Sequence, residues 1–317
     1  MRLYLCSTVQ ILAALFLINC QPVAEQPGVA TESGSMNPPV LTQTQMDRID
    51  ELTGTKGTQF SEENVYKVAF PRTEVSVTVD GRPFQPFQGM TSWAGFSPTG
   101  EGELQVMGDV TVFEDEVSPA MSAALNNGLE VTALHNHFLH DEPRLMFMHI
   151  GGRGQADRLA GAVHEVLDAI AAVRKENPTP AAVFPGSSVP QENAITPEPL
   201  NAILGVTGSA SNGMYKATFG RTAQMHGIEA GTQMGVNTWA AFAGVDENAV
   251  VDGDFAMHES EVQTVLKALV GAGVHVVAIH NHMIQDQPRY VFLHYWGTGP
   301  AQELARNLRA ALDTLDD

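Results

Sequence analysis

One twenty-residue stretch occurs twice in the chain and most constrains what the chain can fold into. Residues 133–152 read ALHNHFLHDEPRLMFMHIGG, and residues 278–297 read AIHNHMIQDQPRYVFLHYWG. His135 corresponds to His280 and His149 to His294, so the offset is a constant 145 residues. Between the first and last histidine 8 of 15 positions are identical, and six of the 11 histidines occupy matching places. Histidine this dense at a repeated spacing requires a chemical explanation.

The repetition extends well beyond these two histidine motifs. Residues 70–73 (FPRT) recur as 219–222 (FGRT), and Gly108-Asp109 recurs as Gly253-Asp254. A period this long indicates a duplicated domain, because solenoid repeats are much shorter. We expect repeat 1 over 42–176, a Pro-, Ser- and Thr-rich linker over 177–195 and repeat 2 over 196–317.

Each repeat mixes strand patterns with helical patterns, which predicts the α+β class. We expect two tandem homologous repeats, each a mainly antiparallel sheet with two or three helices, packed as a pseudo-symmetric pair. The clearest predicted strands are 65–70, 104–113, 131–137, 145–150 and 274–282. The clearest predicted helices are 45–52, 118–126, 155–173, 197–204, 261–270 and 301–315.

Composition excludes several classes of protein. A hydrophobic content of 44% with 17% charged residues is typical of a folded chain and excludes global disorder. The formal net charge of −19 repels a phosphate backbone, so nucleic acid is not an expected partner.

The N-terminus reads as a signal peptide of the lipoprotein type over 1–19. Arg2 supplies a positive charge, residues 3–18 form a mainly apolar region, and Cys20 follows. We expect cleavage before Cys20 and lipidation of its sulfur. Asn19 departs from the small residue preferred there, so an ordinary cleaved signal or an uncleaved anchor stays open. Residues 20–41 then read as a flexible tether.

This start predicts an exported protein of the cell envelope, on the periplasmic or outer-surface side, with membrane contact through the lipid only. Of the two cysteines, Cys6 lies inside the signal segment. The mature chain would therefore keep Cys20 alone, and its folded part would have no disulfide and no thiol nucleophile.

The paired histidines predict a metal site. In a strand, residues i and i+2 share a face, so the two histidines of each His-Asn-His word point the same way. Burying two adjacent imidazoles without partners costs free energy because their ring nitrogens are polar. A divalent ion can bind both rings, and zinc is the ion that we expect first. A third histidine on the next strand would leave one coordination position open, as in catalytic zinc sites. The predicted ligands are His135, His137, His149, His280, His282 and His294.

Register decides whether the third histidine reaches the pair. A tight turn over 138–143 would put His149 on the wrong face, so a longer connection or a β-bulge is needed. The alternative is a pair of metal-free histidine networks that hold the two repeats together.

The duplicated unit, the His-Asn-His words, the Pro-Arg pairs and the lipoprotein-like start resemble the LppY/LpqO family of bacterial lipoproteins. The resemblance covers nearly everything after the tether and implies two copies of a domain of unknown function. The shorter pattern His-x-His-Phe-Leu-x-Asp is similar to the zinc motif of acetolactate decarboxylase-like folds. That similarity implies the same six histidines as ligands, although the third histidine of each set falls at a different spacing here.

Charged residues near the two histidine motifs are candidates for catalysis. Arg144 and Arg289 follow the proline of each copy and could hold a substrate carboxylate. The other interpretation of each arginine is a salt bridge to Asp141 or Asp286, which we expect to order the turn through side-chain to backbone bonds.

Glu114 and Glu259 match across the copies and could act as a general base or support an imidazole. Their other interpretation is a carboxylate at a helix start. The function expected first is metal-dependent chemistry on a small carbonyl or carboxylate compound. Non-catalytic binding of a metal or small ligand and a purely structural envelope role are the alternatives.

Overall fold

The computed structural model describes residues 40–100, 102–184 and 188–316. The predicted signal peptide, Cys20 and the predicted tether up to residue 39 lie outside the described residues. In the part of the chain that is described, no helix is both long and apolar enough to cross a membrane.

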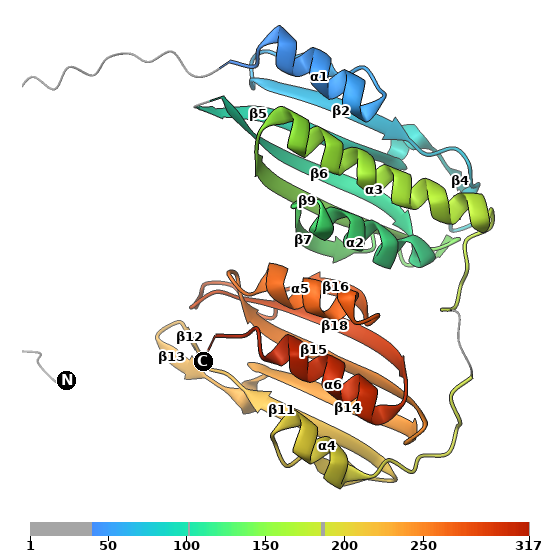
Figure 1. The fold of residues 1–317 in the computed structure, drawn as a ribbon, viewed down its shortest axis with the longest axis vertical. Coiled ribbons are helices and arrows are strands. Elements are labelled where there is room, and N and C mark those ends of the chain that lie inside the picture. The colour runs from blue at the N-terminus through green and yellow to red at the C-terminus, as the bar shows by residue number, and fades with distance from the viewer. Residues whose placement is uncertain (1–39, 101, 185–187, 317) are drawn as a thin grey trace, which may run out of the picture. The chain divides into compact units, whose positions relative to one another are not determined.

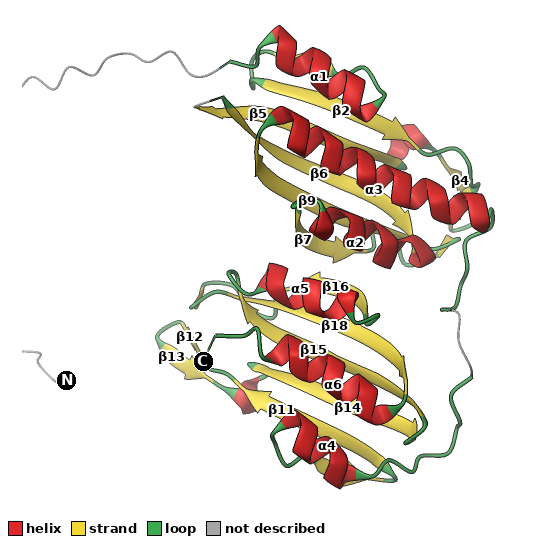
Figure 2. Cartoon of the chain, viewed as in Figure 1, coloured by secondary structure: helices red, strands yellow, loops and turns green. Residues whose placement is uncertain are grey.

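The first repeat contains three α-helices around a set of mainly antiparallel strands (Figure 2). Its elements in chain order are α1 (Gln43–Thr53), β1 (Thr58–Phe60), β2 (Val65–Pro71), β3 (Val77–Val79), β4 (Arg82–Phe84), the 3-10 helix η1 (Pro86–Gln88), β5 (Thr91–Gly100), β6 (Glu103–Phe113), η2 (Glu114–Glu116), α2 (Val117–Asn126), β7 (Glu130–His135), β8 (Asp141–Glu142), β9 (Leu145–Gly154) and α3 (Ala156–Glu176).

The second repeat has the same order of elements, except that among its described residues no 3-10 helix equivalent to η2 precedes α5. They are α4 (Pro197–Leu204), β10 (Ser209–Ser211), β11 (Met214–Gly220), β12 (Ala223–Met225), β13 (Ile228–Ala230), η3 (Thr232–Met234), β14 (Asn237–Val245), β15 (Asn248–His258), α5 (Val262–Gly271), β16 (His275–His280), β17 (Asp286–Gln287), β18 (Tyr290–Gly299) and α6 (Ala301–Leu312).

The strand order shows the duplication directly. The large sheet runs β1-β2-β5-β6-β9-β7-β16-β18-β15-β14-β11-β10, so its second half mirrors its first. The halves join where β7 pairs with β16 through Leu134 and Ile279. The Gln263 side chain adds two bonds across this join, to the N–H and the carbonyl of Val131, at 3.0 and 2.9 Å. The predicted α+β class with two pseudo-symmetric repeats is confirmed.

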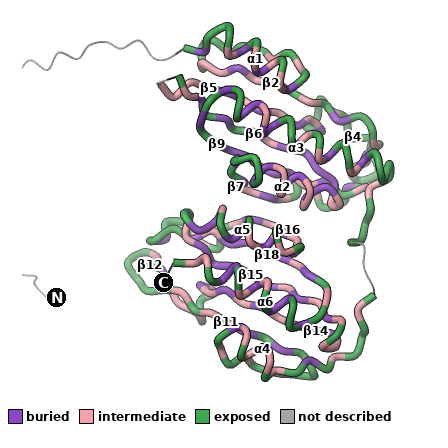
Figure 3. Tube along the Cα trace, in the orientation of Figure 1, coloured by how far each residue is buried: buried purple, intermediate pink, exposed green. Residues whose placement is uncertain are grey.

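Alternation along the central strands divides the sheet into two faces. Val110, Leu134 and Met148 are almost fully buried and pack in the core beneath the helices, which cover one face (Figure 1). Their strand neighbours His135 and His149 therefore point to the opposite face. Buried residues alternate with less buried ones along most of these strands, and long continuous buried stretches lie at the ends of β6 and β15 (Figure 3).

Two small sheets cover part of the histidine face. They have the orders β4-β3-β8 and β13-β12-β17, and each lies beside a separate apolar cluster. Phe113 and Phe147 belong to the first cluster, and Ala256 and Phe292 belong to the second. Of these short strands, β8, β12, β13 and β17 escape a search for hydrophobic periodicity because each has only two or three residues.

Strands β7 and β16 are shorter than predicted, and this part of the prediction was wrong. Each ends at the first histidine of its His-Asn-His word. The Asn136 amide donates to the Phe138 carbonyl at 2.5 Å, and Asn281 donates to Met283 at 3.2 Å. These side-chain bonds close a turn, so the second histidine of each word lies just past its strand.

A buried glutamate anchors the start of a helix in each repeat. Glu116 is fully buried and accepts hydrogen bonds from Arg72 at 2.5 and 2.8 Å and from the Phe113 N–H at 2.8 Å. Arg174 Nε approaches the same carboxylate at 2.6 Å. Through Phe113 and Arg174, the Glu116 carboxylate connects the end of β6, the start of α2 and the end of α3.

Glu261 plays the same part in the second repeat. It accepts from Arg221 at 2.7 and 3.0 Å and from the N–H groups of His258 and Asp316 at 2.6 and 2.7 Å. Burial raises the pKa of Glu261, but the hydrogen bonds from Arg221 and the two N–H groups outweigh it and leave the pKa below its ordinary value.

We expect Glu261→Gln to lower the free energy of unfolding at pH 7 by about 3 kcal/mol, because it leaves Arg221 buried without its counter-charge. The pKa of Glu261 is lower in the folded state than in the unfolded state, so its carboxylate stabilises the fold fully at pH values above the unfolded-state pKa. This stabilisation is lost as the pH falls through the folded-state pKa. Urea unfolding at pH 7 and at stepwise lower pH should therefore show the two proteins converging in acid. Glu247→Gln, at an exposed position, is the control, and a deficit independent of pH would contradict the assignment.

Candidate metal centre

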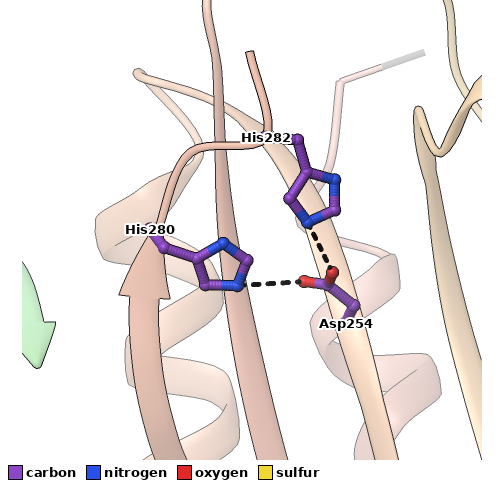
Figure 4. Close-up of side chains that lie close together, drawn as sticks. All are labelled: Asp254, His280 and His282. Carbon is purple, nitrogen blue, oxygen red and sulfur yellow. Dashed lines mark ion pairs between the residues drawn. The ribbon is translucent and has the colours of Figure 1, made fainter.

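Three side chains of the second repeat converge on the open face of the sheet. Ligand atoms of Asp254, His280 and His282 all lie within 4.8 Å of one another (Figure 4). His282 Nε2 is 3.1 Å from Asp254 Oδ2, and His280 Nε2 is 4.0 Å from Asp254 Oδ1. The two imidazoles thus face the two oxygens of one carboxylate.

Strand register brings these residues together. Asp254 of β15 pairs with His294 of β18, which in turn pairs with Ala278 of β16. A register shift between Val276 and Ala278 places His280 on the same face as His294. An insertion at the equivalent place, between Val131 and Ala133, does the same in repeat 1. The bulge that the sequence leaves open is therefore present in both copies.

His282 faces an acceptor at each of its ring nitrogens. Its Nδ1 lies 3.3 Å from the Gly235 carbonyl, while its Nε2 faces the Asp254 carboxylate. A neutral imidazole carries one N–H, so it can donate to one of these two acceptors only. A cation between Nε2 and the carboxylate would balance the second contact.

The Asp254 carboxylate is almost completely buried. The residue is 2% exposed, and its Oδ1 has no hydrogen-bond partner; neither has the buried Nε2 of His280 opposite. Burial raises the pKa of Asp254, although His294 and His282 act in the lowering direction. An unsatisfied carboxylate oxygen and an unsatisfied imidazole nitrogen that face each other form a donor set suited to a divalent ion.

His294 lies beside the group without sharing its 4.8 Å sphere. Its ring centroid is 4.7 Å from that of His280, and its Nδ1 lies 3.1 Å from the Gly253 carbonyl. An Nδ1–H that donates to a carbonyl leaves Nε2 with a free lone pair, the tautomer that ligates metals. The third predicted histidine therefore lies beside His280 with a nitrogen free to bind a metal.

Repeat 1 gathers the matching residues in a different way. His135 and His149 form a hydrogen bond between their Nε2 atoms at 3.0 Å, and the ring of His137 lies 5.2 Å from that of His135. Asp109 pairs with His149 across β6 and β9, and its Oδ1 is buried without a partner. Here the histidines contact one another directly.

The predicted catalytic residues form ion pairs with one another. Arg144 Nε lies 3.9 Å from Glu114 Oε1, and Arg289 Nε lies 3.3 Å from Glu259 Oε1. Glu114 lines a cavity with Met146 and the first residues of α2. Because Met146 alternates with the histidine-face residues of β9, this cavity lies toward the helix side.

Asp141 and Asp286 order the turns, as the sequence predicts. Their Oδ2 atoms accept hydrogen bonds from the N–H groups of Leu145 and Tyr290 at 2.6 and 2.7 Å. The arginines that follow pair with glutamates instead of with these aspartates. The predicted alternative of an Arg–Asp salt bridge is therefore not what the structure shows.

The aspartates of the two sites are the residues that the sequence interpretation missed. The sequence marks Asp109 and Asp254 as a matching pair but assigns them no role. The signal that points to them is a carboxylate in the middle of an apolar strand, at the same 145-residue offset as the histidines. Only the pairing of β6 with β9 and of β15 with β18 shows that each stands beside a histidine.

Burial lowers the pKa of His280, and the neighbouring His294 and His282 lower it further. We expect His280 in chelator-treated protein to titrate below the ordinary value of about 6.5 in an NMR pH series. Because the unfolded chain binds this proton more readily, the contribution of His280 is complete above about pH 6.5. It is lost as pH falls through the folded pKa. A His280→Asn variant should lack this part of the acid destabilisation, and titration above 6.5 would contradict the burial argument.

Comparison with known proteins gives a family but no activity. No curated protein matches the chain. Among solved structures, the trimeric bacterial microcompartment shell protein PduB is 14% identical, with 81% of this chain and 89% of that chain covered and a TM-score of 0.18. The double-ringed trimeric shell protein MSM0271 from the RMM microcompartment is 13% identical, with 78% and 96% covered and a TM-score of 0.19. At these identities and TM-scores, neither structure indicates a function for this chain.

The family match falls on the two repeats. Residues 47–169 and 198–314 each match the family described as Domain of Unknown Function (DUF1259). The chain therefore belongs to this family and carries its domain twice.

Proposed function

We propose that the chain is an exported envelope lipoprotein of the LppY/LpqO type that binds a divalent metal, zinc first, through its second repeat. The observation that carries this proposal is the convergence of Asp254, His280 and His282 within 4.8 Å. The unsatisfied Asp254 Oδ1 and His280 Nε2 support it, because a cation between them would satisfy both. The short-motif similarity to His-x-His zinc folds points the same way.

The spacing of the donor atoms supports a small divalent ion, for which we propose zinc. Zn–N bonds of about 2.0–2.1 Å in a tetrahedron place ligand atoms about 3.4 Å apart. His282 Nε2 lies 3.1 Å from Asp254 Oδ2, close to that value, and His280 Nε2 lies 4.0 Å from the other oxygen, Oδ1. Two histidines and a carboxylate leave a fourth position for His294 or for a substrate.

An open fourth position would support catalysis. A bound ion there would supply a Lewis acid for the oxygen of a small carbonyl or carboxylate compound. Arg289 and Glu259 remain our candidates for orienting the substrate and moving a proton in repeat 2, whereas the Arg144–Glu114 pair of repeat 1 borders a cavity on the helix side. If His294 fills the fourth position instead, the site is a closed one for metal binding without turnover.

One observation favours a second candidate for repeat 1. The direct Nε2–Nε2 hydrogen bond of His135 and His149 satisfies both rings without an ion. In this second candidate, repeat 2 binds the metal. The matching histidines of repeat 1 form a metal-free network with a structural role only.

We expect untagged, chelator-treated protein to bind one equivalent of zinc through repeat 2, measured by calorimetry and elemental analysis. His280→Ala and Asp254→Asn should each weaken this binding by about 100-fold, because each removes a ligand. His135→Ala should leave the repeat 2 equivalent unchanged and report on repeat 1 separately.

His164→Ala is the matched control, since His164 lies on α3, is 46% exposed and pairs only with Asp168 among the described residues. Zinc binding below about a tenth of an equivalent, together with melting unchanged by chelation, would rule out the metal. Tight binding without turnover of any small carbonyl compound would favour the non-catalytic function.

The proposed export can be tested on its own. We expect the full chain, expressed in a bacterium that processes lipoproteins, to fractionate with membranes and to incorporate labelled fatty acid. Cys20→Ser should abolish the label and release the protein, because the sulfur is the proposed attachment point. Labelling that persists in the variant would contradict the lipid anchor.

A further inference from the structure

A cavity of about 430 Å³ lies where the linker passes over the join between the repeats. This volume is in the range of small-molecule sites. Its walls are mainly apolar and come from the start of α2, β9, β16 and the linker. The lining residues that carry the argument are Glu114, Asp115, Ser118, Val277, Phe184 and His275.

A serine and a histidine from different repeats meet at the cavity wall. Ser118 Oγ lies 2.8 Å from His275 Nδ1, and the Phe184 ring stacks on the imidazole with centroids 3.6 Å apart. Burial lowers the pKa of His275. A neutral imidazole with a lone pair on Nδ1 accepts the hydrogen bond from the Ser118 O–H, which leaves the lone pairs of the Ser118 oxygen free to accept from a ligand.

The polar atoms of the cavity are mostly acceptors. Asp115 Oδ2 is held by Arg174 and by the Ala181 N–H, but its Oδ1 has no hydrogen-bond partner. Glu114 lies nearby with a half-exposed carboxylate. No lysine or arginine is among the described residues that line the cavity.

We propose that this cavity binds a small organic ammonium ion with an apolar or aromatic body. The ammonium supplies donors to the Ser118 oxygen and to the carboxylates of Glu114 and Asp115, each of which faces an arginine on one side only. The apolar body fills the walls, where Phe184 offers an aromatic face to the cation. The site is independent of the proposed metal centre.

The repeat symmetry argues against a merely structural Ser–His contact. At the symmetry-related place, Gln263 replaces Ser118 and Glu130 replaces His275. Gln263 ties the repeats together with two bonds to the Val131 backbone. On the other side of the join, which residues 181–184 cover, Ser118 and His275 form the hydrogen bond and the cavity lies beside them. The chain therefore has one such site.

Titration of the mature protein with phenethylamine tests the proposal, with 2-phenylethanol and 3-phenylpropionate as neutral and anionic counterparts. We expect the amine to bind with a Kd of roughly 0.1–1 mM, as its size allows. The alcohol should bind at least about tenfold more weakly, and the carboxylate should not bind. Calorimetry or ligand-observed NMR measures all three.

Variants place the binding in the cavity. Glu114→Gln should weaken amine binding by about tenfold, and Val277→Trp should abolish it by filling the space at a residue that is 43% exposed. Glu259→Gln, the equivalent change outside the cavity, should have no effect, and melting curves report that each variant folds. Equal binding of amine and alcohol, no amine binding, or amine binding that survives Val277→Trp would each overturn the proposal.

Discussion

The structure depends on how β9 and β18 pair with the strands on both their sides. Each of these strands presents apolar residues to the helices and alternate residues to the other face. The same hydrogen bonds therefore fix the core and align Asp109 with His149, and Asp254 with His294. A shift of one residue would expose the core and bury the imidazoles, so the register cannot change without loss of the fold.

Much of this arrangement follows from sequence. The constant offset of the histidine words predicts a duplicated α+β domain, and alternation in 104–113 and 145–150 predicts the central strands. Spacing alone could not predict the bulge that brings His149 to the side of His135, because a bulge depends on the partner strand. Nor could it predict that Asn136 ends β7 before the second histidine, since a competing side-chain bond decides that.

Residues that act through long-range pairing are the ones that sequence reasoning misses. Glu116 and Arg72 are separated by 44 residues, yet the carboxylate is fully buried against the guanidinium. Asp254 and His280 likewise come from strands that β18 separates. Nothing in the sequence next to these charges indicates burial. In both cases the repeat offset was the available clue, since a charge kept in both copies satisfies the same constraint twice.

The linker that covers residues 115–118 on one side of the join has no equivalent on the other side. A dimer of two identical single-domain chains would present both sides of its axis alike, so whatever evolved on one side would also appear on the other. Fusing the copies removes that obligation. One flank of the join can keep a purely mechanical tie while the other changes freely, so a second role can evolve without loss of the contact that holds the repeats together.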